Sequence, residues 1–365
     1  MKNSDSITVF QLSYLAMMAI GFKTHVTIIP PLLQTAGRDG WISVLFSVIV
    51  ISIWCILLIS IHKETKKQHL TIWLKQHIGI FFTAVIIIVI CIYLILLASF
   101  AIRETITWVR IDFLPTTPEW VGTIVFGALC TVTAAFGLRT MAIINFFLLT
   151  MVLVFGFFVA TVNIQVKDYS LLLPILENGF SPVLKASIYQ IAAMAELLFF
   201  LFLQQKVERP FRYRDFFINV MLLGFLTMGP LVAAIAEFGP VEAAKQRHPA
   251  YEEWGLVQLG QFIEHFDFLS IYQWFSGAYI RTSLLLLIMI ELMNIKNKKI
   301  KKWTLFGAFL LMTSVGFIPM SDSVFYKLLI TILLPTTAYI FIGISILLGI
   351  IVLLTRLRGG KSTNG

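Results

Sequence analysis

Long hydrophobic blocks separated by short polar segments organise this chain from end to end. A block of about 20 apolar residues is long enough to cross a bilayer as a helix. The pattern therefore predicts an all-α polytopic membrane protein with one transmembrane domain, residues 1–365. Ten transmembrane helices are expected, near residues 7–34, 41–61, 78–102, 119–136, 141–160, 183–203, 215–237, 268–292, 303–318 and 327–355.

Two of these blocks are interrupted by residues that a lipid-facing helix avoids. Gly21 and Lys23 lie at mid-depth in the first block, and Glu196 follows Ala195 in the middle of the sixth. A charge at the bilayer centre costs about 2.5–3.5 kcal/mol on insertion scales, so it faces a protein interior or a cavity. Interrupted helices in corresponding positions of two halves are typical of transporters built as inverted repeats. We expect an inverted 5+5 repeat with helices 1 and 6 broken, comprising residues 7–160 and 183–355.

The composition fits this picture and excludes other classes. The chain is 58% hydrophobic and 13% charged, which leaves little length for a soluble domain. Its net charge of +9 comes from basic residues in short loops, so we expect a membrane protein and no nucleic-acid partner. With the amino terminus inside, 18 Lys and Arg residues fall in inner segments and 8 in outer ones. This bias predicts that both termini are cytoplasmic.

The first interruption is a candidate ligand site. A half-helix that begins at Gly21, Phe22, Lys23 and Thr24 would point free N–H groups at a ligand carboxylate. Lys23 would add a positive charge or act as a protonation switch, or it would pair with a structural carboxylate instead. Tyr93 is a further candidate polar group of the pocket.

The second interruption offers the complementary chemistry. Ala195 and Glu196 could bind the ammonium group of a ligand, or Glu196 could form an ion pair with Lys23 or Arg281. Arg281 lies about half-way through the eighth block, where an arginine must be paired. We expect Arg281 to be a structural or gating partner. The chain has no nucleophile elbow, phosphate loop or metal-binding motif, so we expect no enzyme, no catalytic residue, no cofactor and no metal site.

Two loops are long enough to carry structure. The segment 63–77 is basic and contains apolar residues, which predicts a position at the inner membrane interface. In the segment 239–266, Leu256, Leu259, Ile263 and Phe266 recur at helical spacing. They predict a short amphipathic helix over the outer mouth, with either a packing role or the role of a lid.

Three stretches carry a resemblance to a known family. They are Thr35-Ala-Gly-Arg-Asp-Gly-Trp-Ile-Ser43, Met194-Ala-Glu-Leu-Leu198 and Ser276-Gly-Ala-Tyr-Ile-Arg-Thr282. Through them the chain resembles the endospore germination permeases, which are the B subunits of nutrient germinant receptors within the amino acid–polyamine–organocation superfamily. The resemblance implies a fold of the leucine-transporter type, with a nutrient, often an amino acid, bound between helices one, three, six and eight. It also implies a spore inner-membrane complex with A and C subunits.

Two functions of different class remain open at this point. The chain is either the nutrient-sensing subunit of a germinant receptor or a secondary transporter of amino acids or amines, with proton coupling through Lys23 or Glu196. The sequence names neither the nutrient nor any translocated solute.

Overall fold

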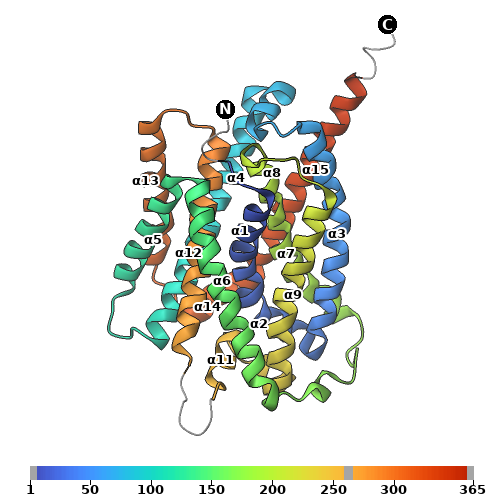
Figure 1. The fold of residues 1–365 in the computed structure, drawn as a ribbon, viewed down its shortest axis with the longest axis vertical. Helices are drawn as coiled ribbons and strands as arrows, with labels where there is room; N and C mark the ends of the chain where they lie inside the picture. The colour runs from blue at the N-terminus through green and yellow to red at the C-terminus, as the bar shows by residue number, and fades with distance from the viewer. Residues whose placement is uncertain (1–5, 259–265, 360–365) are drawn as a thin grey trace.

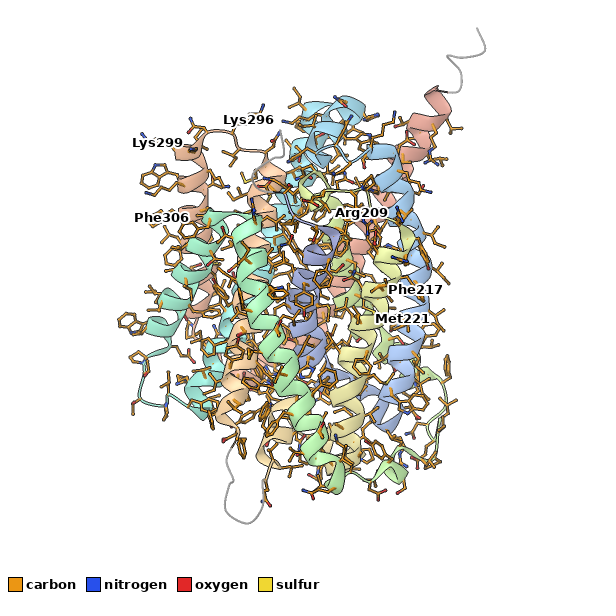
Figure 2. The ribbon with its side chains drawn as sticks, viewed as in Figure 1. Arg209, Phe217, Met221, Lys296, Lys299 and Phe306 are labelled. Atoms are coloured by element: carbon orange, nitrogen blue, oxygen red, sulfur yellow. The ribbon has the colours of Figure 1, made fainter. Side chains whose placement is uncertain are left out.

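The computed structural model describes residues 6–258 and 266–359, which form a bundle of long helices (Figure 1). No strand occurs in these described ranges; an isolated bridge pairs Ile7 with Val207. Both termini lie at the same end of the bundle (Figure 1). Lys296, Lys299 and Arg209, which were all predicted to be on the inner side, lie towards that end (Figure 2).

Residues 6–172, the described part of the first half, contain six α-helices and a π-helical turn. They are α1 (Val9–Phe22), the π turn η1 (Lys23–Thr27), α2 (Ile29–Ala36), α3 (Gly40–Thr65), α4 (Leu70–Asp112), α5 (Glu119–Phe136) and α6 (Leu138–Val162). Short 3-10 turns follow α2 and α6, namely η2 (Gly37–Asp39), η3 (Asn163–Val166) and η4 (Tyr169–Leu172).

The second half begins with another helix of uneven pitch. It consists of α7 (Ser181–Met194), the 3-10 turn η5 (Ala195–Leu198), α8 (Phe199–Leu203) and η6 (Gln204–Lys206). Then come α9 (Tyr213–Phe238), α10 (Pro240–Ala243), α11 (Pro249–Gly255), α12 (Phe268–Met293), α13 (Lys298–Ser314), η7 (Val315–Phe317), α14 (Asp322–Leu328), the π turn η8 (Leu329–Leu333) and α15 (Leu334–Gly359).

Within the described residues, eight helical stretches are long and apolar enough to cross a membrane. The protein is therefore a multi-pass membrane protein. The predicted first span is divided among α1, η1 and α2, and α2 belongs to a stretch that runs from Ile29 to Thr65. The predicted span 303–318 corresponds to α13, which has only 17 residues. The count of ten spans and the inverted repeat stay predictions.

The predicted inner-interface segment folds as a short helix tied to the bundle. Gly79 has φ 80°, a left-handed conformation that separates residues 70–78 from the long part of α4. Thr71 Oγ1 donates to the Leu292 carbonyl at 2.6 Å, and Trp73 is buried. These contacts fix the segment against the end of α12.

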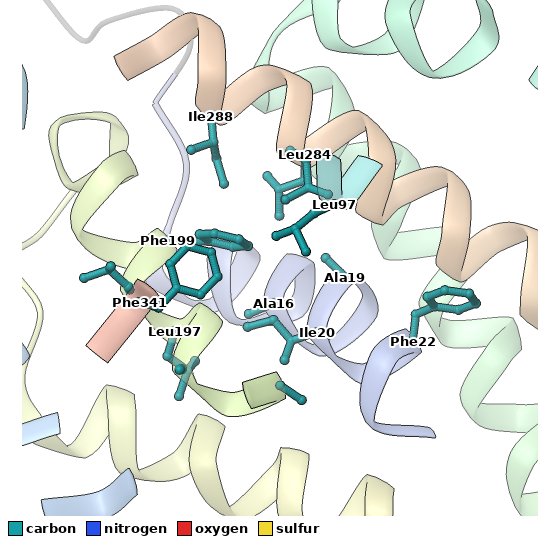
Figure 3. Close-up of a cluster of buried hydrophobic side chains, with 14 of the residues drawn as sticks. Ala16, Ala19, Ile20, Phe22, Leu97, Leu197, Phe199, Leu284, Ile288 and Phe341 are labelled. Atoms are coloured by element: carbon teal, nitrogen blue, oxygen red, sulfur yellow. The ribbon is translucent and has the colours of Figure 1, made fainter. Parts of the chain in front are cut away.

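The core lies around α1, α7–α8 and α12. In the most hydrophobic windows of Ser181–Lys206 and Phe268–Met293, 83% of the residues are buried, against 22% in Leu138–Val166. Figure 3 shows the cluster between these helices, in which Ala16 and Ile20 of α1 face Leu197, Phe199 and Leu284. The two helices that the sequence singled out are therefore largely buried in the centre of the bundle.

The predicted amphipathic outer helix falls mainly on residues 259–265, which lie outside the described residues. The part of that loop that is described forms α10 and α11, and α11 ends at Gly255. Val257 and Trp254 pack against Val159 of α6 in a small second hydrophobic cluster.

Candidate functional site

The two interruptions change the pitch of their helices but do not unwind them. Lys23 keeps helical backbone angles (φ −65°, ψ −42°), and its N–H donates to the Ile20 carbonyl. Ala195 is likewise helical (φ −60°, ψ −19°) and begins a 3-10 turn. The sequence predicted a cradle of free N–H groups from Gly21 to Thr24, and the structure has a π turn there. The groups available for binding are therefore side chains.

These pitch changes bring three charges together. Arg281 Nη1 donates to Glu196 Oε2 at 2.6 Å, and Arg281 Nη2 donates to Glu196 Oε1 at 2.8 Å. Lys23 Nζ donates to the same Oε1 at 3.0 Å. We call Lys23, Glu196 and Arg281 the charge triad. It joins η1, η5 and α12, three elements that are far apart in the sequence.

The charge triad is almost completely removed from solvent. The exposed fractions of its side chains are 4% for Lys23, 0% for Glu196 and 5% for Arg281. Both cations also donate to helix carbonyls, Lys23 to Ala192 and Arg281 to Ala19. With all three groups ionised, the triad carries one net positive charge. A buried net charge is costly unless a further partner balances it.

A second carboxylate supplies that negative charge. Glu104 of α4 is buried, and its Oε2 accepts a hydrogen bond from Thr27 Oγ1 at 3.1 Å. Its Oε1 has no hydrogen-bond partner, and Arg247 Nη1 lies 3.8 Å from it. Glu104 was not among the site residues predicted from the sequence, although a glutamate beside Arg103 near the end of a hydrophobic block was a usable signal.

A small cavity lies between the charge triad and Glu104. Its wall includes Lys23, Thr27, Glu104 and Arg281, together with apolar side chains such as Phe22. The volume is about 20 Å³, which is room for about one water molecule. The site is therefore closed in this conformation, and a larger ligand requires the surrounding helices to move.

A group of aromatic side chains adjoins the site, because Trp274 packs against Phe22 of the cavity wall. Trp108 and Trp274 stack with their ring centroids 4.1 Å apart, and His248 packs edge-on against Trp274 at 4.7 Å. Arg247 lies over the ring of Tyr326 at 4.2 Å, with its Nε 3.5 Å from Asp322 Oδ2. The segment between α10 and α11 thus contacts α12 and α14.

The other predicted site residues lie nearby in different roles. Phe22 packs edge-on against Trp274, with ring centroids 6.0 Å apart. Thr24 Oγ1 donates back to the Gly21 carbonyl at 3.1 Å, and Ala195 is fully buried. Tyr93 Oη lies 2.7 Å from Thr337 Oγ1. Lys23, Arg281 and Phe22 line the cavity, whereas Thr24 and Tyr93 have other polar partners.

A larger hollow lies elsewhere and has different chemistry. It is an open groove of about 570 Å³ between α4, α5, α6 and α12, lined mostly by apolar side chains. Its charged residues, Arg110 and Glu119, form an ion pair at 2.8 Å. The small cavity, with opposite charges in its wall, is the better candidate for a polar ligand. In the described ranges, no three His, Cys, Asp or Glu side chains gather as a metal site.

Comparison with known proteins places the chain in a family. Residues 6–325 match the family described as spore germination protein. The chain belongs to that family. It is 37% identical over 332 residues to spore germination protein XB of Bacillus anthracis, covering 91% of this chain and 93% of the relative. It is 24% identical over 271 residues to spore germination protein A2 of Bacillus subtilis (strain 168), covering 71% of each chain.

The family membership agrees with the resemblance drawn from the sequence and with the helical bundle. The protein is a multi-pass membrane protein of a spore germination family with a permease-like helical architecture.

Proposed function

We propose that this protein is the nutrient-sensing subunit of a spore germinant receptor. In this proposal it binds a small nutrient, an amino acid, at the cavity between Lys23, Glu104 and Arg281. Binding is then signalled to A and C partner subunits in the spore inner membrane, with both termini of this chain in the cytoplasm. The ten-helix inverted repeat belongs to the same proposal.

The observation that carries the proposal is the presence of opposite charges in the wall of one cavity. Lys23 and Arg281 line the cavity together with Glu104, whose buried Oε1 has no hydrogen-bond partner and lies 3.8 Å from Arg247 Nη1. An amino acid is a zwitterion, so its carboxylate would bind the two cations while its ammonium group would bind Glu104. In this arrangement Glu196 does not contact the ligand, because Lys23 and Arg281 already donate three hydrogen bonds to its two oxygens.

Signalling follows from the small size of the cavity. Room for about one water means that the described conformation is closed, so binding must select a more open arrangement of η1, α4 and α12. A ligand shifts such an equilibrium only by its differential affinity for the two states, and moving it from 1:99 to 99:1 needs about 10⁴-fold. Partner subunits would read the changed positions of these helices.

The test is the nutrient dose response of spores that carry Glu104→Gln. Glutamine keeps the size of the side chain but removes the charge opposite the ligand ammonium. Loss of a buried charge pair costs about 2–5 kcal/mol, and each 1.4 kcal/mol is about tenfold in concentration. We expect the half-maximal nutrient concentration to rise by at least about tenfold while protein levels stay unchanged.

Glu242→Gln is the matched control, because Glu242 is exposed on α10 and pairs with Lys245 at 2.7 Å. This control should leave the dose response unchanged. An unaltered dose response in Glu104→Gln spores, with the protein present at normal levels, would count against the proposed binding site.

Buried charges inside a helical bundle also suit a second candidate function, a secondary transporter of amino acids or amines. Purified protein in liposomes separates the two functions. Robust uptake of an amino acid driven by a proton gradient would favour the transporter, whereas binding without uptake would favour the receptor subunit.

A further inference from the structure

A second group of buried charges lies outside the cavity and is independent of the proposed nutrient site. Glu237 is at the end of α9, Glu253 is on α11, and Lys167 follows the 3-10 turn η3. Lys167 Nζ is 3.4 Å from Glu237 Oε1, and the side chains of this pair are 6% and 0% exposed. Glu253 is 6% exposed. Two carboxylates thus share a dry environment with one ammonium group.

Several oxygen atoms of this group have no hydrogen-bond partner. They are both carboxylate oxygens of Glu237, Oε1 of Glu253 and Oδ1 of Asn163, a side chain that is 1% exposed. The Asn163 amide is held in place because its Nδ2 donates to the Glu253 carbonyl at 2.8 Å. Lys167 also donates to the Ala160 carbonyl at 3.2 Å. The group therefore has more hydrogen-bond acceptors than hydrogen-bond donors.

The net charge of this group indicates which kind of ion would neutralise it. With both carboxylates ionised and Lys167 protonated, the site has one net negative charge in a buried position. Uncompensated buried charge is strongly unfavourable, so such a group binds a cation or a proton. A single positive charge restores neutrality, and two carboxylates that share one site commonly share one proton.

We propose that Glu237 and Glu253 form a proton-binding site that fastens the outer helix α11 to α9 and η3. One proton, shared between the carboxyls, supplies the missing donor and neutralises the site. Burial raises the pKa of the Glu253 carboxyl well above its usual value, and the nearby Glu237 raises it further, while Lys167 opposes the shift.

The other titratable groups near α11 act on residues other than Glu253. Glu252, on α11 itself, is exposed. On the elements that contact α11, His25 of η1 bonds to the Leu226 carbonyl at 3.3 Å, and Asp112 of α4 acts on Glu252 and Tyr251. Asp267, next to α12, acts on Tyr251. Lys167 and Glu237 are the charged groups that act on Glu253.

The site has a consequence for the rest of the molecule. α11 contacts both α9 and η1, the turn that carries Lys23. A carboxyl whose pKa is raised on folding stabilises the docked state at low pH and loses that stabilisation as the pH rises through the raised value. The hold on α11 should therefore weaken in alkaline conditions.

Infrared spectroscopy of the purified full chain tests the proposal, because a protonated carboxyl has a C=O stretch that a carboxylate lacks. At neutral pH, the wild type should show one protonated carboxyl band that is lost in Glu253→Gln and in Glu237→Gln. The Glu237 substitution removes it because Glu253 can then ionise opposite Lys167. Glu252→Gln is the matched control on the same helix and should keep the band.

Absence of such a band from the wild type, or its survival in both variants, would overturn the proposal. Loss of the band when sodium or calcium chloride is added at constant pH would also overturn it, because a metal ion would then be the occupant.

Hydrogen exchange of the α11 amides, corrected for intrinsic rates, provides a second readout. Exchange should accelerate as the pH rises from neutral into the alkaline range in the wild type and stay constant in Glu253→Gln. Equal acceleration in the two proteins would contradict the assignment.

Discussion

Arg281 and Glu196 form a bidentate ion pair in the middle of the bundle, with contacts of 2.6 Å and 2.8 Å. Two parallel N–H···O bonds are the strongest geometry open to an arginine and a carboxylate. Lys23 adds a single contact at 3.0 Å to the same carboxylate. The pair joins α12 to η5, so it fixes the relative position of two helices that line or flank the cavity.

The first prediction is an order of stabilities for variants of the charge triad. Glu196→Ala leaves two buried cations without their carboxylate, and breaking a buried pair costs about 3–5 kcal/mol. Arg281→Met leaves the Lys23–Glu196 pair, and Lys23→Met leaves the stronger bidentate pair. Thermal unfolding in detergent should therefore rank Glu196→Ala as least stable, then Arg281→Met, then Lys23→Met. A Lys23→Met protein less stable than Glu196→Ala would contradict this account of the triad.

The second prediction concerns the contact between α1 and α12. A Cβ added at Gly277 would lie 2.7 Å from Phe22 Cδ2, closer than side-chain carbons approach. Gly277→Ala must displace Phe22, and overpacking of this kind costs about 1–3 kcal/mol. Thermal unfolding should show a clear loss of stability. Gly307→Ala in α13 is the control, since nothing lies within 4 Å of an added Cβ there. Equal stability of Gly277→Ala and Gly307→Ala would show that this close approach is absent.

The third prediction concerns Arg103, whose side chain binds the backbone of the turn at residues 315–320. Its guanidinium donates to the carbonyls of Val315, Ile318 and Met320 at 2.9, 2.9 and 2.8 Å. Arg103→Met leaves these acceptors unsatisfied, so hydrogen exchange in residues 315–320 should increase. Arg110→Met is the control, because Arg110 is half-exposed and pairs with Glu119. Unchanged exchange in the turn would mean that water replaces Arg103 without loss.

The sequence identified the three residues of the charge triad but not the way in which they pair. Lys23, Glu196 and Arg281 stand out because each interrupts a hydrophobic block. Their pairing depends on how α1, α7 and α12 pack, and no local pattern contains that information. Gly21 suggested an unwound helix, yet the backbone there is helical and the pitch changes two residues later.

Residues near the ends of predicted spans were harder to interpret. Glu104 is buried inside α4, because that helix continues to Asp112, well beyond the predicted end at residue 102. Glu253 lies in the segment 239–266, which was predicted to be a loop, and its burial depends on α11 packing through Trp254 against α6. In both cases tertiary packing buries a polar residue that the sequence alone places near solvent.

The central claim, a zwitterion held between Lys23, Arg281 and Glu104, is tested most directly by binding to the purified protein. A panel of L-amino acids identifies the one that binds. Its affinity is then compared with that of the matching amine, which lacks the carboxylate, and the matching acid, which lacks the ammonium group. The account predicts that the wild type loses at least about tenfold in affinity for both analogues. It also predicts that Glu104→Gln no longer distinguishes the amino acid from the acid. Equal affinity of the wild type for the amino acid and both analogues would contradict it.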